Sequence, residues 1–214
     1  MQVVMLGGGG HARVVADLLS NCRTPGDVSG YVDPHDCGEV EGLPYLGPDS
    51  ILDKLAVTST LLANGIGSLP RQTTRKDLYE RYSNLGFRFP ALVHRKSTVA
   101  ASATLADGVQ IMAGGIVQPA TQIGNNTIVN TGAIVDHDCL IGPHAHIAPG
   151  AVLNGGVTLD AGVHIGTGAR VLQGVHIGEN AIIGVGASVR KNVPKGAVVF
   201  GAEGYVQDPG DERT

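Results

Sequence analysis

Residues 123–153 read IGNNTIVNTGAIVDHDCLIGPHAHIAPGAVL, and this stretch decides the fold because every sixth residue, starting with the first, is Val, Leu or Ile. The same register extends in both directions. From Val93 to Val189, 17 consecutive positions at six-residue spacing are aliphatic. The residue four places after each of them is small or of medium size, as at Cys139 and Ala145. A pattern this regular predicts one repeated structural unit over nearly half of the chain.

The six-residue period, with Gly or Asn at the turns, indicates a parallel β-helix in which three short strands form one triangular coil of 18 residues. Residues 93–194 supply about five and two-thirds coils. Each coil is expected to stack on the previous one at the spacing of paired strands, about 4.8 Å, with the aliphatic residues inside the prism. Because no insertion interrupts the register, we expect any active site to lie on the flat faces, where neighbouring subunits meet.

The first 92 residues follow a different pattern, in which short hydrophobic strands alternate with helices. This alternation predicts a small parallel βαβαβ sheet. In its first helix, Val14, Val15, Leu18 and Leu19 are expected on the buried side. The expected elements are strands at 3–6, 28–32 and 60–66 and helices at 11–19, 50–55 and 71–85. The chain is thus expected to comprise an α/β domain at 1–92, the β-helix at 93–194 and a C-terminal cap or tail at 195–214.

Composition excludes several classes of partner. Charged residues make up only 16 % of the chain and hydrophobic residues 43 %, which predicts self-association. A net charge of −4 without a basic cluster gives no footprint for nucleic acid or an anionic membrane. The sequence shows no apolar run long enough to span a bilayer and no signal-peptide pattern. Its three cysteines have no metal-type spacing, so we expect reduced thiols and a cytoplasmic protein.

A glycine loop follows the first strand. The pattern Gly7-x-Gly9-x-x-Ala12 fits a phosphate-binding turn at a helix N-terminus, and Asp33 ends the second strand where a ribose-binding acid would lie. Only about half of a dinucleotide-binding fold fits before the repeats begin. The loop therefore predicts a site for a nucleoside diphosphate, such as that of an activated sugar, although a tight packing turn and a plain turn at Asp33-Pro34 stay as alternatives.

Three histidines in ten residues form the densest titratable cluster. His137 is followed by Asp138, which can fix its tautomer and raise its basicity. Gly155 lies 18 residues later, one coil above His137, where its backbone N–H can meet an oxyanion. His146 is half a coil from His137, so the two can meet only across a subunit boundary. For His146, and for His137 itself, a purely structural histidine stays as an alternative.

The remaining histidines carry weaker signals. His144 is expected to be a solvated turn residue. His164 and His176 directly precede interior positions and are expected to be stacked on the prism faces. His11 follows the glycine loop at the start of the helix, where it is as compatible with substrate contact as with a structural role.

With these motifs together, residues 1–205 resemble the sugar O-/N-acetyltransferases of the left-handed hexapeptide-repeat proteins, a family that includes bacillosamine and perosamine N-acetyltransferases and sialic acid O-acetyltransferases. The resemblance implies a left-handed β-helix, a homotrimer with active sites at subunit interfaces, and acetyl-CoA as co-substrate without a metal.

The resemblance also assigns roles by position. His137 would be the general base, Asp138 the acid that raises its basicity, and Gly155 the donor to the thioester oxygen. His146, Thr167 and Val185 would contact acetyl-CoA. The nucleotide-sugar would be bound by Gly9, Gly10, His11, Asp33, Pro34, Gly67 and Asn130. Because relatives carry a second acid at the position of Pro34, the base of the nucleotide, uracil or guanine, stays open.

We therefore expect direct acetyl transfer from acetyl-CoA to the amino group of a UDP- or GDP-linked sugar. O-acetylation of sialic acid or a related sugar is the first alternative. A zinc hydrolyase of the hexapeptide carbonic anhydrase type, using His137, His144 or His146, and His164, is the second. A nucleotide-binding scaffold without catalysis, or an NAD-linked oxidoreductase, is the third.

Overall fold

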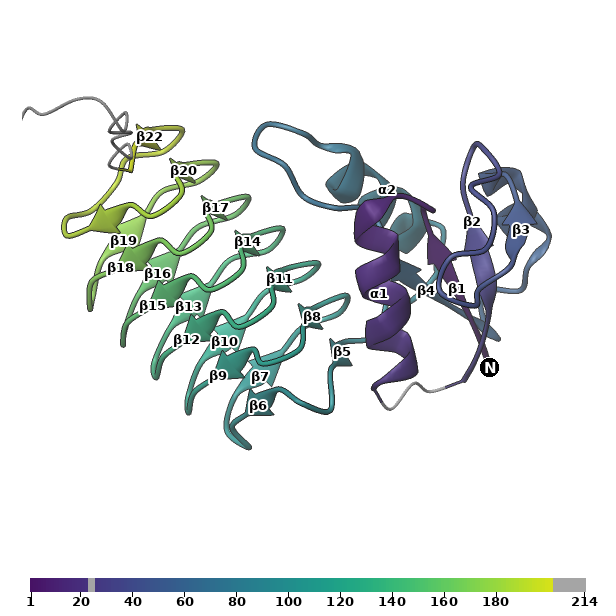
Figure 1. The fold of residues 1–214 in the computed structure, drawn as a ribbon, viewed down its shortest axis with the longest axis horizontal. Helices are drawn as coiled ribbons and strands as arrows, with labels where there is room; N and C mark the ends of the chain where they lie inside the picture. The colour runs from purple at the N-terminus through teal and green to yellow at the C-terminus, as the bar shows by residue number, and fades with distance from the viewer. Residues whose placement is uncertain (23–25, 202–214) are drawn as a thin grey trace, which may run out of the picture.

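The computed structural model describes residues 1–22 and 26–201, in an α/β half followed by a long prism of stacked coils (Figure 1). The expected cap or tail at 195–214 lies outside the described residues from position 202 onward. Repeats of the prism begin at β5 (Leu92–Val93), which follows directly on the α/β half.

The α/β half is a four-stranded sheet in the order β3-β2-β1-β4, and its strand pairs are all parallel. The elements are β1 (Gln2–Leu6), α1 (Gly10–Ser20), β2 (Asp27–Val32), β3 (Tyr45–Gly47), the 3₁₀ helix η1 (Asp49–Lys54), β4 (Thr60–Asn64) and α2 (Thr74–Asn84). The sequence pattern did not predict β3, which is only three residues long. Helix α2 begins three residues later than predicted, since Pro70 and the positive φ of Arg71 (67°) precede it.

Side chains of the sheet alternate between its two faces, as the period of a strand requires. Val3 and Met5 pack on the side of α1, whereas Val4 and Leu6 pack on the side of α2. Prism residues such as Ile128 join the core on the α1 side, so this helix lies between sheet and prism (Figure 1). The two halves therefore share one continuous core.

Helix α1 buries a stripe that differs by one residue from the prediction. Ala12, Val15, Ala16, Leu18 and Leu19 are buried, whereas Val14 is 40 % exposed. The buried set follows the i, i+3, i+4, i+7 spacing from Ala12, which leaves Val14 on the outer side of the helix. The expectation for Val14 was wrong because it counted hydrophobic residues and overlooked the two alanines.

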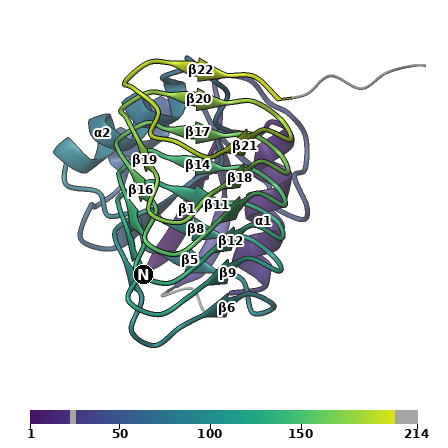
Figure 2. The ribbon, with the colours of Figure 1, turned by 90° about the vertical axis from the view of Figure 1, so that its left-hand side faces the viewer.

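The prism is a left-handed parallel β-helix with three sheets of two-residue strands (Figure 2). Face 1 contains β5 and then β8 (Gln110–Ile111), β11 (Ile128–Val129), β14 (His146–Ile147), β17 (His164–Ile165), β20 (Ile182–Ile183) and β22 (Val198–Val199). Face 2 contains β6 (Thr98–Val99), β9 (Ile116–Val117), β12 (Ile134–Val135), β15 (Val152–Leu153), β18 (Arg170–Val171) and β21 (Ser188–Val189). Face 3 contains β7 (Thr104–Leu105), β10 (Gln122–Ile123), β13 (Leu140–Ile141), β16 (Thr158–Leu159) and β19 (His176–Ile177).

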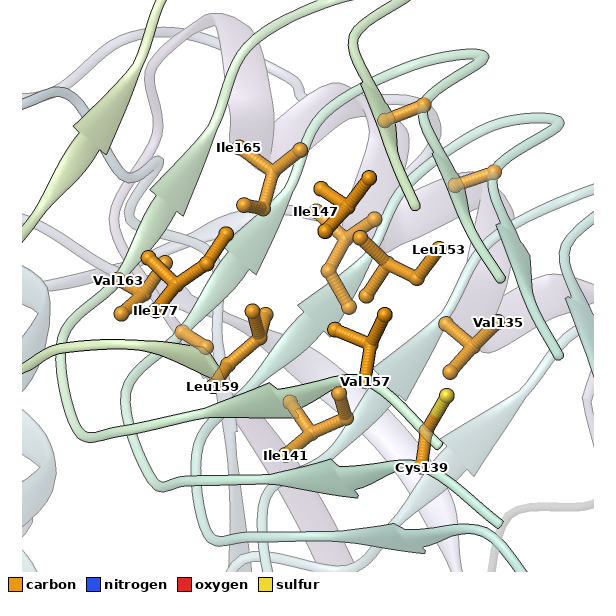
Figure 3. Packing of buried hydrophobic residues seen from close by; sticks show 14 of the residues in the cluster. Val135, Cys139, Ile141, Ile147, Leu153, Val157, Leu159, Val163, Ile165 and Ile177 are labelled. Atoms are coloured by element: carbon orange, nitrogen blue, oxygen red, sulfur yellow. The ribbon is translucent and has the colours of Figure 1, made fainter. Parts of the chain in front are cut away.

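Each strand pairs with the strand 18 residues later, as His146 with His164 and Ile147 with Ile165. The second residue of each strand points inward, and these side chains fill the prism in layers (Figure 3). Cys139 also lies in this core and is fully buried. The predicted register of the repeats is thereby confirmed.

Truncation of one interior residue should destabilise the fold strongly. Ile165 is fully buried in the core of the prism, so Ile165→Ala should lower the free energy of unfolding by about 2–5 kcal/mol through lost burial and a residual cavity. Leu172→Ala is the matched control, because Leu172 is 48 % exposed and should change that free energy by about 0.5 kcal/mol or less. Equal losses for the two variants in urea titrations would contradict the layered core.

Candidate active site

The glycine loop lies at the carboxyl edge of the small sheet. Strand β1 is flanked by β2 on one side and β4 on the other, so the chain reverses direction in the sheet at this strand. In open parallel sheets, ligands bind at such a switch point. Gly7 has φ +90°, and an added Cβ would collide with Ile66, so the turn requires glycine there. Gly9 and Gly10 are exposed, with open space around them, at the N-terminus of α1.

Asp33 is tied to this loop by hydrogen bonds. Its Oδ2 accepts from the Gly8 N–H at 2.9 Å, and its Oδ1 accepts from the His35 N–H at 3.0 Å. The carboxylate therefore shapes the turn in this structure, which is the alternative that the sequence left open. Pro34 is exposed beside it.

His11 and Gly67 meet on the β4 side of the loop. An added Cβ on Gly67 would lie 3.3 Å from the Cβ of His11. The His11 side chain is mostly buried, and its Nε2 has no hydrogen-bond partner among the described residues. Burial, aided by the charge of Arg75, lowers the pKa of His11 to about 4. His11 is therefore a neutral imidazole with one free nitrogen.

A second group of residues lies at the corner between faces 2 and 3. His137 is in the turn after β12, and its Nδ1 lies 2.7 Å from Oδ2 of Asp138. With a neutral ring, Nδ1–H donates to this carboxylate and Nε2 keeps its lone pair. Asp138 has φ +58°, a conformation that Asp tolerates better than most residues, and this turn brings its carboxylate back onto the preceding ring.

The His137 ring packs directly over Gly155 of the next coil. A Cβ added to Gly155 would lie 2.7 Å from the imidazole Nε2, so only glycine fits at this position. The Gly155 N–H has no acceptor among the described residues, whereas the neighbouring Gly156 N–H donates to the His137 carbonyl at 2.8 Å. A basic nitrogen and a free N–H donor thus lie side by side.

Charge makes His137 a stronger base than a free histidine. The hydrogen bond to Asp138 raises its pKa, and the negative charge of Asp136 adds to this effect. Asp136 also accepts from the His137 N–H at 2.8 Å. The sequence analysis did not assign Asp136 a role, although acids on both sides of the histidine were visible in the Asp-His-Asp triplet.

His146 has a contrasting environment on face 1. It is 9 % exposed, its Nδ1–H donates to the Ser68 carbonyl at 3.0 Å, and its Nε2 accepts from the Asn130 Nδ2 at 3.1 Å. The ring lies edge-on to His164, with 4.8 Å between centroids. Burial above all, and then the positive charge of His164, lowers its pKa to about 3. His146 and Asn130 therefore meet the Ser68 loop of the α/β half, a contact that the sequence could not reveal.

Thr167 and Val185 lie on the corner between faces 1 and 2. Both are exposed and occupy successive coils, and the Gly186 N–H donates to the Thr167 carbonyl at 2.9 Å. Within one chain, His137 lies at a different corner from these two residues and from His146, as its place half a coil away required.

His144 corrects one prediction. It was expected to be a solvated turn residue, but its side chain is only 14 % exposed, because the α/β half covers it. Its ring packs edge-on against Tyr79 of α2 and its Nδ1 lies 3.0 Å from Nδ2 of Asn126. His176 lies on face 3, where its Nε2 is 3.0 Å from an Asp160 carboxylate oxygen.

Neither a metal centre nor a membrane span is evident in the part of the chain that the structure describes. No three His, Cys, Asp or Glu side chains among those residues are grouped to hold a metal ion. None of the described helices has the length and hydrophobicity to cross a bilayer.

Two protein families match the chain. The PglD N-terminal domain matches residues 2–82, and the bacterial transferase hexapeptide family, described by six repeats, matches residues 120–155. A comparison with curated protein sequences finds no match.

Solved structures of similar proteins cover almost the whole chain. The acetyltransferase domain of PglB from Neisseria gonorrhoeae FA1090 is 33 % identical, with 94 % of this chain and 96 % of that chain covered and a TM-score of 0.87. The same domain is also known in complex with acetyl coenzyme A. PerB from Caulobacter crescentus, in complex with CoA and GDP-perosamine, is 35 % identical, with 94 % of each chain covered and a TM-score of 0.85.

Acidification should destabilise the fold through its buried histidines. His11 and His146, with pKa values of about 4 and about 3, stay neutral in the folded chain, while the unfolded chain binds protons below pH 6.5. The free energy of unfolding should therefore fall between pH 6.5 and pH 4, by up to about 1.4 kcal/mol per pH unit for each group. Urea titrations at several pH values measure this slope.

A variant and a control identify the origin of the slope. His146→Gln should make it shallower, whereas substitution of the exposed His35 by Gln should leave it unchanged. If His146→Gln has the slope of the parent protein, the buried imidazole is not the source of acid sensitivity.

Proposed function

The chain belongs to the hexapeptide-repeat sugar acetyltransferases that carry a PglD N-terminal domain, and we propose that it transfers the acetyl group of acetyl-CoA to the amine of a nucleotide-linked amino sugar. Its identity as an acetyltransferase follows from the family. The observation that supports the proposed chemistry is the His137–Asp138 pair packed over the free N–H of Gly155.

The α/β half supports a nucleotide-linked acceptor. Its glycine loop presents exposed backbone at a helix N-terminus, the arrangement that suits a diphosphate. PerB, which is similar over 94 % of this chain, was solved with a GDP-linked sugar. We assign nucleotide-sugar binding to Gly9, Gly10, His11, Asp33, Pro34, Gly67 and Asn130. A free sugar acid would leave this half without a use, so we favour N-acetylation over O-acetylation.

In the proposed mechanism, the amine attacks the thioester carbonyl carbon while Nε2 of His137 takes its proton. The carbonyl oxygen becomes an oxyanion, to which the Gly155 N–H donates. The intermediate then expels the thiolate of CoA, and no covalent enzyme intermediate forms. Asp138 holds the His137 Nδ1–H, so the lone pair stays on Nε2 throughout.

Acetyl-CoA would lie along the edge of the prism. Thr167 and Val185 are exposed on successive coils, which suits an extended pantetheine arm, and the neutral His146 lies on the adjoining face. Since His137 is at another corner, one chain does not assemble the whole site. We therefore assign His137 and the acetyl-CoA contacts of each site to different subunits of a homotrimer.

Face 2 offers a surface for this assembly. Its outward side chains include the half-buried Ile116, Ile134 and Val152, an apolar row between the two corners that must meet. The cysteines Cys22, Cys37 and Cys139 are free thiols, which suits our proposal of a cytoplasmic enzyme.

An acceptor screen tests the proposed reaction. We expect CoA thiol release from acetyl-CoA with one UDP- or GDP-linked amino sugar, and a fall in kcat of about 10²–10⁴ for His137→Ala with unchanged nucleotide-sugar affinity, because only the base is lost. Turnover with sialic acids alone would shift the assignment to O-acetylation. Release by His137→Ala at the parent rate would refute the role of this histidine.

Asp138→Asn should move the pH dependence of the reaction. His137 must be neutral to accept a proton, so kcat/KM should fall as the pH drops through its pKa, which Asp138 raises above 6.5. Without the carboxylate this pKa decreases, and the acid limb should shift to lower pH.

Asp160→Asn provides the matched control for this shift. Asp160 pairs with His176 on face 3, so its loss removes a similar pair without touching His137. Steady-state kinetics between pH 5.5 and 9 measure both limbs. An acid limb that Asp138→Asn leaves in place would assign it to another group.

A further inference from the structure

A second hollow of the protein lies on the α2 side of the joint between the two halves. It has a volume of about 300 Å³ and lies between the segment 68–76 and the prism. From the segment it is lined by Arg71, Arg75 and Lys76, and from the prism by Asn126, His164 and Asn180, among others. We call it the α2 cavity. None of the residues assigned above to acetyl-CoA or nucleotide-sugar binding lines it.

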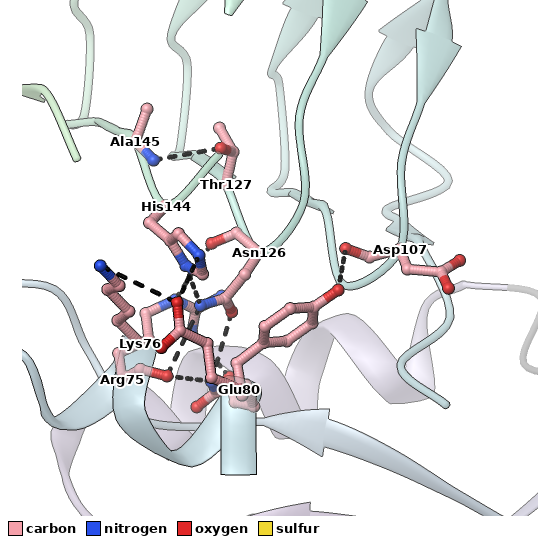
Figure 4. Close-up of polar contacts among 10 residues, drawn as sticks. Arg75, Lys76, Glu80, Asp107, Asn126, Thr127, His144 and Ala145 are labelled. Carbon is pink, nitrogen blue, oxygen red and sulfur yellow. Dashed lines mark hydrogen bonds and ion pairs between the residues drawn. The ribbon is translucent and has the colours of Figure 1, made fainter. Parts of the chain in front are cut away.

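Arg75 places a buried positive charge at this cavity. Its side chain is 5 % exposed and donates only to neutral oxygens, namely the carbonyls of Asn64, Ile66 and Asn126 and the Oε1 of Gln110 (Figure 4). These bonds use four of its five N–H groups. No carboxylate lies within ion-pair distance of Arg75 among the described residues. Buried charges in proteins are usually paired, so this one lacks its usual counter-ion.

The other lining groups carry the same sign or are neutral donors. Arg71 and Lys76 add two exposed cations, and no Asp or Glu lines the cavity. The nearby acids are already engaged: Glu80 lies 3.8 Å from Lys76 and 3.6 Å from His144, and Asp77 accepts from the Thr73 hydroxyl. His164 contributes a buried Nδ1 without a partner among the described residues.

From this set of groups we propose that the α2 cavity binds a phosphoryl anion, the charge that Arg75 lacks. Arg71 and Lys76 contact the anion from the solvent side, and Arg75 stabilises it from below. Helix α2 begins at Thr74 beside the cavity, so its free backbone N–H groups add to the attraction.

Occupation of the cavity would also act on the acetyl-CoA side of the joint. The Ser68 carbonyl accepts from His146, and Ser68 lines the cavity as well. A bound anion therefore fixes the loop 68–73 against the prism from one side, while His146 holds it from the other.

Titration calorimetry with inorganic phosphate and with pyrophosphate tests the proposal on the unmodified full chain. We expect pyrophosphate to bind, and the double variant Arg71→Ala/Lys76→Ala to weaken binding about tenfold or more, because two charge-assisted contacts are lost. Lys54→Ala is the matched control, since Lys54 is an exposed cation outside the cavity, and it should bind as the parent does.

A competition arm separates this cavity from the glycine loop. Saturating UDP or GDP should leave the pyrophosphate titration of the parent protein unchanged, because the proposed nucleotide site lies elsewhere. Displacement by a nucleotide together with unimpaired binding in the double variant would place the anion at the glycine loop and overturn the proposal. Absence of pyrophosphate binding to the parent protein would also overturn it. Neither result depends on acetyltransferase activity.

Discussion

Stacking in an unbroken 18-residue register is the constraint on which the rest of this structure depends. Each strand of the prism is only two residues long, and no coil could bury its aliphatic side chains alone. The register also determines which side chains meet, because residues 18 apart lie on top of each other. His137 meets Gly155 and His146 meets His164 for this reason. The catalytic geometry is therefore a by-product of core packing.

The same fold gives two of its histidines opposite electrostatic properties. His137 is half exposed between two acids, which raise its pKa, whereas His146 is buried among neutral and basic groups that lower its own. The first is a base that becomes cationic when it takes a proton. The second stays neutral and can only exchange hydrogen bonds. Such a division between titratable groups is how one site separates proton transfer from positioning.

Sequence reasoning was most successful where structure follows from local periodicity. The interior register, the βαβαβ order and the contact of His137 with both Asp138 and Gly155 could all be predicted, because each depends on residues at fixed spacing. Contacts between the halves could not. The burial of His144 under Tyr79 and the bond from His146 to Ser68 join residues more than 60 positions apart, and nothing in the repeat encodes them. Val14 shows a smaller limit, since alanines took the place expected for a larger residue.

The one-coil step of the prism also makes the molecule a ruler with a single graduation. Insertion or deletion of 18 residues between β14 and β17 would preserve every interior contact, yet it would displace Thr167 and Val185 from His146 by one strand spacing, about 4.8 Å. Smaller changes would break the register. Divergence along this axis is thus restricted to whole steps, so the reach of the carrier arm that such a chain accepts can change in increments but cannot drift.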